Sequence, residues 1–244
     1  MRAALAVSLG TSAIAMVVVT LFGVPLAYAL SRSTFRGTAL LRTAVDLPIV
    51  IPPPVVGIAL LIFAGPRTAL GGVLESGFHM ILSPGSSLGQ ALGGDRCYNA
   101  FPIVLAQVFV SWPFLVRSSL VAFQDVDTRF ERVARTLGAS SLETFRRVTL
   151  PLAMRGIAVG MILCWLRGMA EFGSLTVLAS FPKTAPLLTM DKFTVLGGLS
   201  EAQPVAVLLV VLSLAVFLVM WLVRAMPSRI AAVVRGPQEQ TRAG

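Results

Sequence analysis

The sequence predicts an all-α integral membrane protein with about five transmembrane helices, and three observations support this fold class. Of the 244 residues, 56% are hydrophobic and only 13% are charged, which is about half the charged share of a soluble domain. The charges leave long apolar runs, each with the roughly 20 residues that a helix needs to cross hydrocarbon. Basic residues gather in alternate connections between these runs. A buried soluble core does not account for five such runs.

The apolar runs place the spans in order along the chain. Four runs contain no charged residue, and the fifth, 156–182, carries only Arg167 and Glu171. The small residues around Tyr28 have the spacing of a signal-peptide cleavage site, but the apolar region exceeds the ~7–15 residues expected there. We therefore expect it to remain as a span, and a further span upstream of Met1 would raise the count to six. The expected spans are 3–30, 44–65, 98–120, 153–180 and 203–224.

The charge distribution predicts the orientation of these spans. Most of the 20 basic residues lie after spans one, three and five. The positive-inside rule then places the amino terminus outside and the carboxyl terminus in the cytoplasm. The net charge of +9 follows from this pattern, so we expect contact with lipid and no nucleic-acid partner. The chain is interpreted as one membrane domain, 1–244, with a cytoplasmic loop, 123–151, and a basic cytoplasmic tail, 225–244.

The polar loop after span three carries signals for two short helices. Asp127 or Thr128 can cap the first helix, and Gly138 suits the left-handed position that follows its end. Ser140-x-x-Glu143 is a capping-box pattern that starts a second helix. Pro151 suits the first turn of span four. The loop is therefore predicted to read as helix, glycine turn, helix and proline.

The first of these helices has an apolar face that a short loop has no core to bury. The residues on it recur at helical spacing and are Phe130, Val133, Ala134 and Leu137. Either this face packs against the inner ends of the spans, or it docks on another protein, as amphipathic helices commonly do. A helix lying on the membrane surface is a third possibility.

The same loop resembles the signature of ABC importer permeases, which is Glu-Ala-Ala, three residues, Gly, nine residues and Ile-x-Leu-Pro. Gly138 and Val148-Thr149-Leu150-Pro151 match its second half. Arg132, Val133 and Ala134 occupy the Glu-Ala-Ala positions, so only the last residue matches. Glu131 lies one position before the glutamate of the signature. The resemblance implies that two separate ATPase subunits dock on this loop. The residues implied in that coupling are Phe130, Glu131, Val133, Ala134, Leu137, Gly138, Val148, Leu150 and Pro151.

Other segments resemble the permeases of molybdate/tungstate importers. These segments are "DLPIVIPPPVVGIALL", "RGMAEFGSLTVLA", "FPKTAPLL" and "AQPVAVLLVVLSLAVF". The resemblance implies the type I ABC importer permease fold, a homodimer, and an extracytoplasmic substrate-binding protein that lands on the outer loops, 66–97 and 181–202. Sulfate/thiosulfate permeases share the Glu-Phe-Gly element, so their substrates remain an alternative. An ion-coupled secondary carrier is a second alternative, from another class.

No residue of this chain is predicted to be catalytic. A phosphate-binding loop needs Gly-x-x-x-x-Gly-Lys-Ser/Thr, and neither Lys183 nor Lys192 follows a glycine. We therefore expect no enzyme activity and no cofactor here, with ATP and magnesium bound by the partner ATPase. Cys97 and Cys164 form no C-x-x-C pair, so neither a disulfide nor a metal site is expected. His79 is interpreted as a solvated side chain of an outer loop.

A translocation pathway is expected where span two is interrupted. Pro52, Pro53 and Pro54 remove three backbone donors about ten residues into that span, near the bilayer midplane. Broken backbone at this depth is tolerated within protein or along a water-filled cavity, and transporters often place it at their pathway. The alternative is a kink that only shapes packing.

Span four carries charges that are expensive at the depth of the bilayer. Arg167 and Glu171 stand four residues apart, so on a continuous helix they share a face. They either neutralise each other as a structural pair, or Glu171 orients Arg167 toward a passing oxyanion. Gly173 permits a close approach of helices or serves packing alone.

Overall fold

The computed structural model describes residues 2–33, 37–65, 67–81, 100–178, 182–195 and 198–225. Within these ranges the regular structure is helical and contains no strand, so the all-α prediction is confirmed. The elements are α1 (Arg2–Arg32), α2 (Thr38–Val50), α3 (Pro53–Ala64), α4 (Ala69–Ile81), α7 (Phe101–Gln124), α8 (Thr128–Thr136), α9 (Ser141–Thr144), the π-helix η1 (Phe145–Thr149), α10 (Leu150–Met169), α11 (Leu175–Leu178), α12 (Ala185–Thr194) and α13 (Leu199–Ala225).

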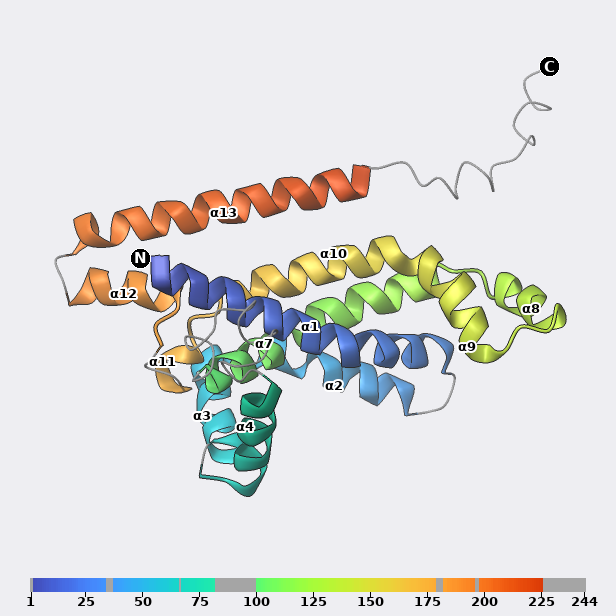
Figure 1. The fold of residues 1–244 in the computed structure, drawn as a ribbon, viewed down its shortest axis with the longest axis horizontal. Coiled ribbons are helices and arrows are strands. Elements are labelled where there is room, and N and C mark those ends of the chain that lie inside the picture. The colour runs from blue at the N-terminus through green and yellow to red at the C-terminus, as the bar shows by residue number, and fades with distance from the viewer. Residues whose placement is uncertain are drawn as a thin grey trace, which may run out of the picture.

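Three long helices, α1, α7 and α10, form the centre of the molecule (Figure 1). Their shared core contains Val19 of α1, Phe123 of α7 and Ile157 of α10, all buried. Small residues let α7 and α10 approach closely, because a Cβ at Gly156 would lie 2.3 Å from the Ala122 Cβ. The Ser118 hydroxyl also donates to the Gly156 carbonyl at 2.8 Å. Small side chains and hydroxyl bonds are typical of helix contacts within membranes.

Within the described residues, four helical stretches are long and apolar enough to cross a membrane, at Arg2–Arg32, Phe101–Gln124, Ser141–Met169 and Leu199–Leu222. The predicted second span is not one straight helix. It divides into α2 and α3, which meet at 111°, because the intervening prolines cannot continue the α2 hydrogen-bond ladder. The count of five therefore holds only if this bent pair is one span. The predicted fourth span, 153–180, was too long, since α10 ends at Met169.

Different helices lie at the two ends of the bundle (Figure 1). Helices α8 and α9 project beyond the end where α1 and α7 finish. At the other end, α11 and α12 lead into α13, which packs on α12 and α10. The outer loop expected at 66–97 contains a helix in its first part, α4, which packs against α3 and contains His79. The rest of that loop, with Cys97, and the tail from 226 lie outside the described residues.

Candidate functional site

The junction of α2 and α3 is built by the three prolines. Ile51 and Pro52 are extended, with ψ of 129° and 133°. Pro53 and Pro54 then occupy the first turn of α3, where backbone N–H groups have no helical partner and proline loses nothing. The amides of Val55 and Val56 donate to the Pro52 carbonyl at 2.9 and 3.1 Å. The interruption predicted from the prolines is therefore present, as a corner between two helices.

The predicted charge pair joins the last turn of α10, which holds Arg167, to the non-helical turn after it, which holds Glu171. Arg167 Nη1 lies 2.6 Å from Glu171 Oε2, as the spacing of four residues suggested. Glu171, however, lies beyond the end of the helix and not inside the span. Its other oxygen accepts from the backbone N–H and hydroxyl of Ser174, at 2.8 and 2.9 Å. Glu171 is 2% exposed, so three donors satisfy a carboxylate that would otherwise be costly to bury.

The proline corner and the Glu171 turn are packed directly against each other. A Cβ at Gly173 would lie 2.6 Å from the Pro53 Cβ, and one at Gly57 would lie 2.5 Å from the Ser174 carbonyl oxygen. Real Cβ contacts are almost never this short. The structure thus places Gly173 at a close approach between the turn and the start of α3. The predicted pathway residues, which are distant in sequence, come together here.

A small cavity of about 100 Å³ opens at this junction. Its walls are apolar apart from Arg167, whose side chain is 27% exposed. The other lining residues are Pro48, Ile49, Ile51, Pro53, Val56, Val110 and Phe114. A guanidinium in such a wall can bind an oxyanion through its planar fork of donors, and the Glu171 pair fixes the orientation of that fork.

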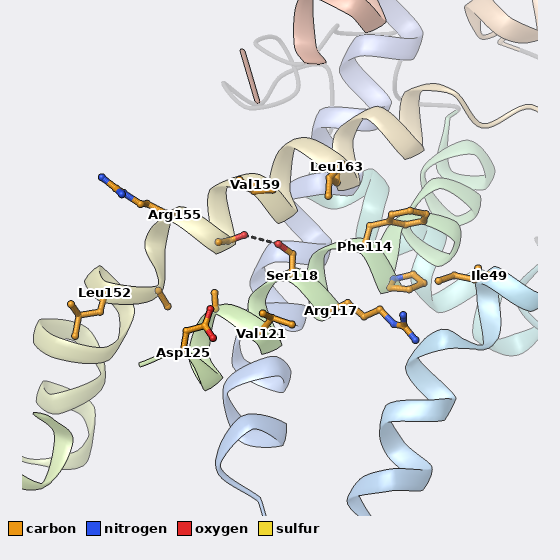
Figure 2. A pocket seen from close by; sticks show the side chains of 14 residues that line it. Ile49, Phe114, Arg117, Ser118, Val121, Asp125, Leu152, Arg155, Val159 and Leu163 are labelled. Atoms are coloured by element: carbon orange, nitrogen blue, oxygen red, sulfur yellow. Dashed lines mark hydrogen bonds between the residues drawn. The ribbon is translucent and has the colours of Figure 1, made fainter. Parts of the chain in front are cut away.

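A larger groove of about 810 Å³ adjoins this cavity, and the two share Ile49 and Phe114 (Figure 2). It runs between α7 and α10 and is mostly apolar, with Arg117, Asp125 and Arg155 among its lining residues. In Figure 2 the Arg117 side chain extends toward α2, where it pairs with Asp46. Sequence reasoning missed this pair because its members are 71 positions apart and no short motif relates them.

The polar loop, 123–151, has the local structure that its motifs predict. The Asp127 carboxylate accepts from the Arg129 amide at 2.8 Å, and Gly138 adopts a φ of +90°. Ser140 and Glu143 form a complete capping box. The Ser140 amide and hydroxyl, with Arg147 nearby, lower the pKa of Glu143. This cap is therefore present at neutral pH and weakens only as the pH falls through that lowered value.

The apolar face of α8 points away from the rest of the chain. Phe130, Val133 and Leu137 are 45%, 58% and 83% exposed, and Ala134 is half-buried. Of the two main interpretations of this face, the one in which it packs against the inner ends of the spans is therefore wrong. Glu131, in the same helix, is buried at 5% exposure. Val148 and Leu150 are half-buried and Pro151 is exposed.

Pro151 does not interrupt the helical segment that connects the loop to α10. Helix α9 passes through η1 into α10 without a break, and the stretch Ser141–Met169 as a whole is long and apolar enough to cross a membrane. In η1 the Leu150 amide donates to the Phe145 carbonyl, five residues back. Such a π-turn widens the backbone where the proline ring would otherwise meet the carbonyl four residues before it.

Comparisons with known proteins agree with this architecture. Residues 7–232 match the family described as binding-protein-dependent transport system inner membrane component. The molybdate/tungstate transport system permease protein of Pyrococcus abyssi is 40% identical over 217 residues, which cover 88% of this chain and 76% of the relative. The molybdenum transport system permease protein of Escherichia coli K12 is 33% identical over 226 residues, 91% and 93% of the two chains.

A third relative is the probable molybdenum ABC transporter permease protein of Haloferax volcanii, which is 38% identical over 203 residues, 83% of this chain and 68% of that one. The family match spans both the proline corner and the polar loop, 123–151. The resemblance inferred from the loop signature is therefore confirmed. The chain belongs to the family of binding-protein-dependent transport system inner membrane components and is a multi-pass membrane permease of an ABC importer.

Proposed function

We propose that this chain imports molybdate or tungstate, with a second copy of itself completing the pathway. The relatives named above carry molybdate, tungstate or molybdenum in their names. The observation that carries the proposal is Arg167, the one cation among the described residues that line the cavity at the proline corner. Its paired orientation suits a tetrahedral oxyanion that passes between α3 and α10.

The energy source is a separate ATPase that docks on α8. The loop offers an exposed apolar line, Phe130, Val133 and Leu137, which fits a groove on a partner. Two ATPase subunits would hold the two loops of a homodimer, and an extracytoplasmic binding protein would deliver the oxyanion at the opposite end. ATP binding closes the ATPase pair and turns the cavity outward, and hydrolysis resets it. This arrangement places the loop and the carboxyl terminus in the cytoplasm.

The two alternatives predict different transport behaviour. A secondary carrier needs an accessible acidic group near the midplane, but Glu171 is buried and occupied by Arg167 and Ser174. The experiment is uptake into proteoliposomes that contain the chain, its ATPase and its binding protein. ATP-dependent accumulation of molybdenum or tungsten supports the proposal, whereas accumulation of sulfate alone identifies the other oxyanion class. Uptake without the ATPase would overturn the ABC mechanism.

Leu137→Asp is expected to weaken ATPase binding by about tenfold or more, because a charge would replace the most exposed apolar side chain of the docking line, Phe130, Val133 and Leu137. The detergent-solubilised chain is titrated against the ATPase, and the dissociation constant is measured. Thr128→Asp is the matched control, since it adds the same charge at an exposed position in the first turn of α8, away from that line. Equal binding by both variants would remove α8 as the docking element.

Arg167→Lys is expected to reduce oxyanion uptake about tenfold while the chain remains folded. Lysine keeps the positive charge beside Glu171 but loses the bidentate fork, and a charged hydrogen bond contributes ~1.5–3 kcal/mol. Initial uptake rates are compared with those of Arg129→Lys, an arginine whose side chain is 81% exposed on the loop. Unchanged uptake in Arg167→Lys would leave Arg167 as a purely structural partner of Glu171.

A further inference from the structure

Glu131 is the carboxylate of α8 that faces the spans. One of its oxygens, Oε1, accepts from Arg32 Nη2 at 2.6 Å, from Arg32 Nε at 3.1 Å and from the Thr149 hydroxyl at 2.9 Å. The other oxygen lies 3.9 Å from Arg135 Nη2. Arg32 also donates to the Val126 carbonyl at 3.3 Å. A single buried carboxylate therefore holds three separate segments of the chain.

These three segments are the end of α1, the start of α8 and the end of η1, which continues into α10. An aromatic cluster ties the same region together with apolar contacts. The ring of Tyr28 lies 5.4 Å from that of Phe123 and 4.7 Å from that of Phe145. These residues come from α1, α7 and η1. The polar contacts of Glu131 and the aromatic cluster around Tyr28 therefore both join the loop to the bundle.

The placement of Glu131 has a mechanical consequence. Glu131 directly follows Phe130 of the docking line, but its side chain is buried whereas those of the line are exposed, so a force applied to the line reaches Glu131 within the same short helix. Helix α8 cannot move away from α1 without separating Arg32 from Glu131. Breaking a buried pair leaves an uncompensated charge and is strongly unfavourable. The pair therefore favours movement of α8, α1 and α10 together.

We propose that Arg32, Glu131 and Thr149 form a clamp that transmits movement of the ATPase-bound loop to α1 and α10. The clamp rests on the proposed docking of an ATPase on α8. The clamp assigns Glu131 a contact within the chain, although Glu131 lies one position before the glutamate position of the loop signature. Arg32, Glu131 and Thr149 are positioning residues, because they would act through the helices they join and touch neither ATP nor the oxyanion.

The test uses the chain reconstituted with its ATPase and binding protein, and the readout is oxyanion transported per ATP hydrolysed. Glu131→Gln is expected to keep ATPase affinity within about twofold and to lower the transport ratio about tenfold, a typical size for coupling between sites. Glu143→Gln is the matched control, a solvent-exposed loop carboxylate that lies 3.9 Å from Arg147, and should keep the wild-type ratio.

Thr149→Val keeps the test decisive if Glu131→Gln folds poorly, and a double variant tests whether Arg32 and Glu131 act as one contact. Thr149→Val preserves shape and the Arg32 pair, and should lower the ratio less than Glu131→Gln does. Arg32→Gln combined with Glu131→Gln should lower it no further than either single change, because one contact is removed in each case. An unchanged ratio in Thr149→Val and in the double variant would overturn the clamp.

Loss of ATPase binding in Glu131→Gln would also overturn the clamp, because it would place Glu131 in the docking surface itself. A wild-type chain that binds no ATPase would instead overturn the proposed function, and the clamp would fall with it. The two failures are separated by measuring ATPase affinity before transport.

Discussion

Glu171→Ala is expected to destabilise the chain by about 3 kcal/mol, the low end of the range for breaking a buried ion pair. Three interactions are lost together, with Arg167 and with the amide and hydroxyl of Ser174. Arg167 then keeps its charge without a partner in an apolar wall. Its partial exposure to the cavity is why the low end applies.

Thermal unfolding of the detergent-solubilised chain, followed by circular dichroism, measures this effect. Glu201→Gln is the control, since Glu201 pairs with Lys192 at 3.0 Å on the surface, where its side chain is 54% exposed. Exposed pairs contribute about 0–1 kcal/mol, so its midpoint should stay near that of the wild type. Equal shifts in the two variants would contradict the account of Glu171 given above. Glu171→Gln should fall between them, because an amide oxygen can still accept from Ser174.

Gly57→Ala is expected to destabilise the chain by about 1–3 kcal/mol, the usual range for overpacking, and to reduce transport. The new methyl group would lie 2.5 Å from the Ser174 carbonyl oxygen. That atom belongs to the backbone, so it cannot rotate away as a side chain could. Helix α3 must therefore shift from the turn that holds Glu171, and the wall around Arg167 shifts with it.

Gly72→Ala supplies the control for this substitution. Gly72 lies in α4, and a Cβ there would meet no atom within 4 Å. Alanine is favoured over glycine within a helix by about 0.5–1 kcal/mol, so this variant should be as stable as the wild type or slightly more so. Both variants are compared by unfolding midpoint and by uptake. A Gly57→Ala chain that matches Gly72→Ala in both would show that α3 and the turn are not tightly packed.

Local patterns predicted much of this fold because local chemistry determines those features. Three successive prolines cannot continue a helix, so the division after α2 could be inferred from the sequence. The loop was predicted in detail because the Asp127 cap, Gly138 and the Ser140 capping box each act within four residues. The 111° angle between α2 and α3 was not predictable, since it depends on packing against the Glu171 turn.

Contacts between distant segments were beyond sequence reasoning. Arg32 and Glu131 are 99 positions apart, and nothing in either neighbourhood identifies the other. The helix within the outer loop that begins at 66 was missed for a related reason. Gly71 lies where a Cβ would be 2.0 Å from the Gly65 carbonyl oxygen. That glycine is required by a close turn between α3 and α4, a contact that the glycine content of the segment does not reveal.

Helix α13 should tolerate more substitutions than α7, because fewer of its side chains are buried. Only Ala202, Val205 and Met220 are buried within 199–222, and most of the large apolar side chains there are exposed in the described chain. Hydrocarbon tails are as apolar as leucine, so exchanges among leucine, isoleucine and valine there alter few contacts. Substitutions should thus accumulate more freely along α13 than along α7, and families of this fold would diverge fastest on the outer surface of their last helix.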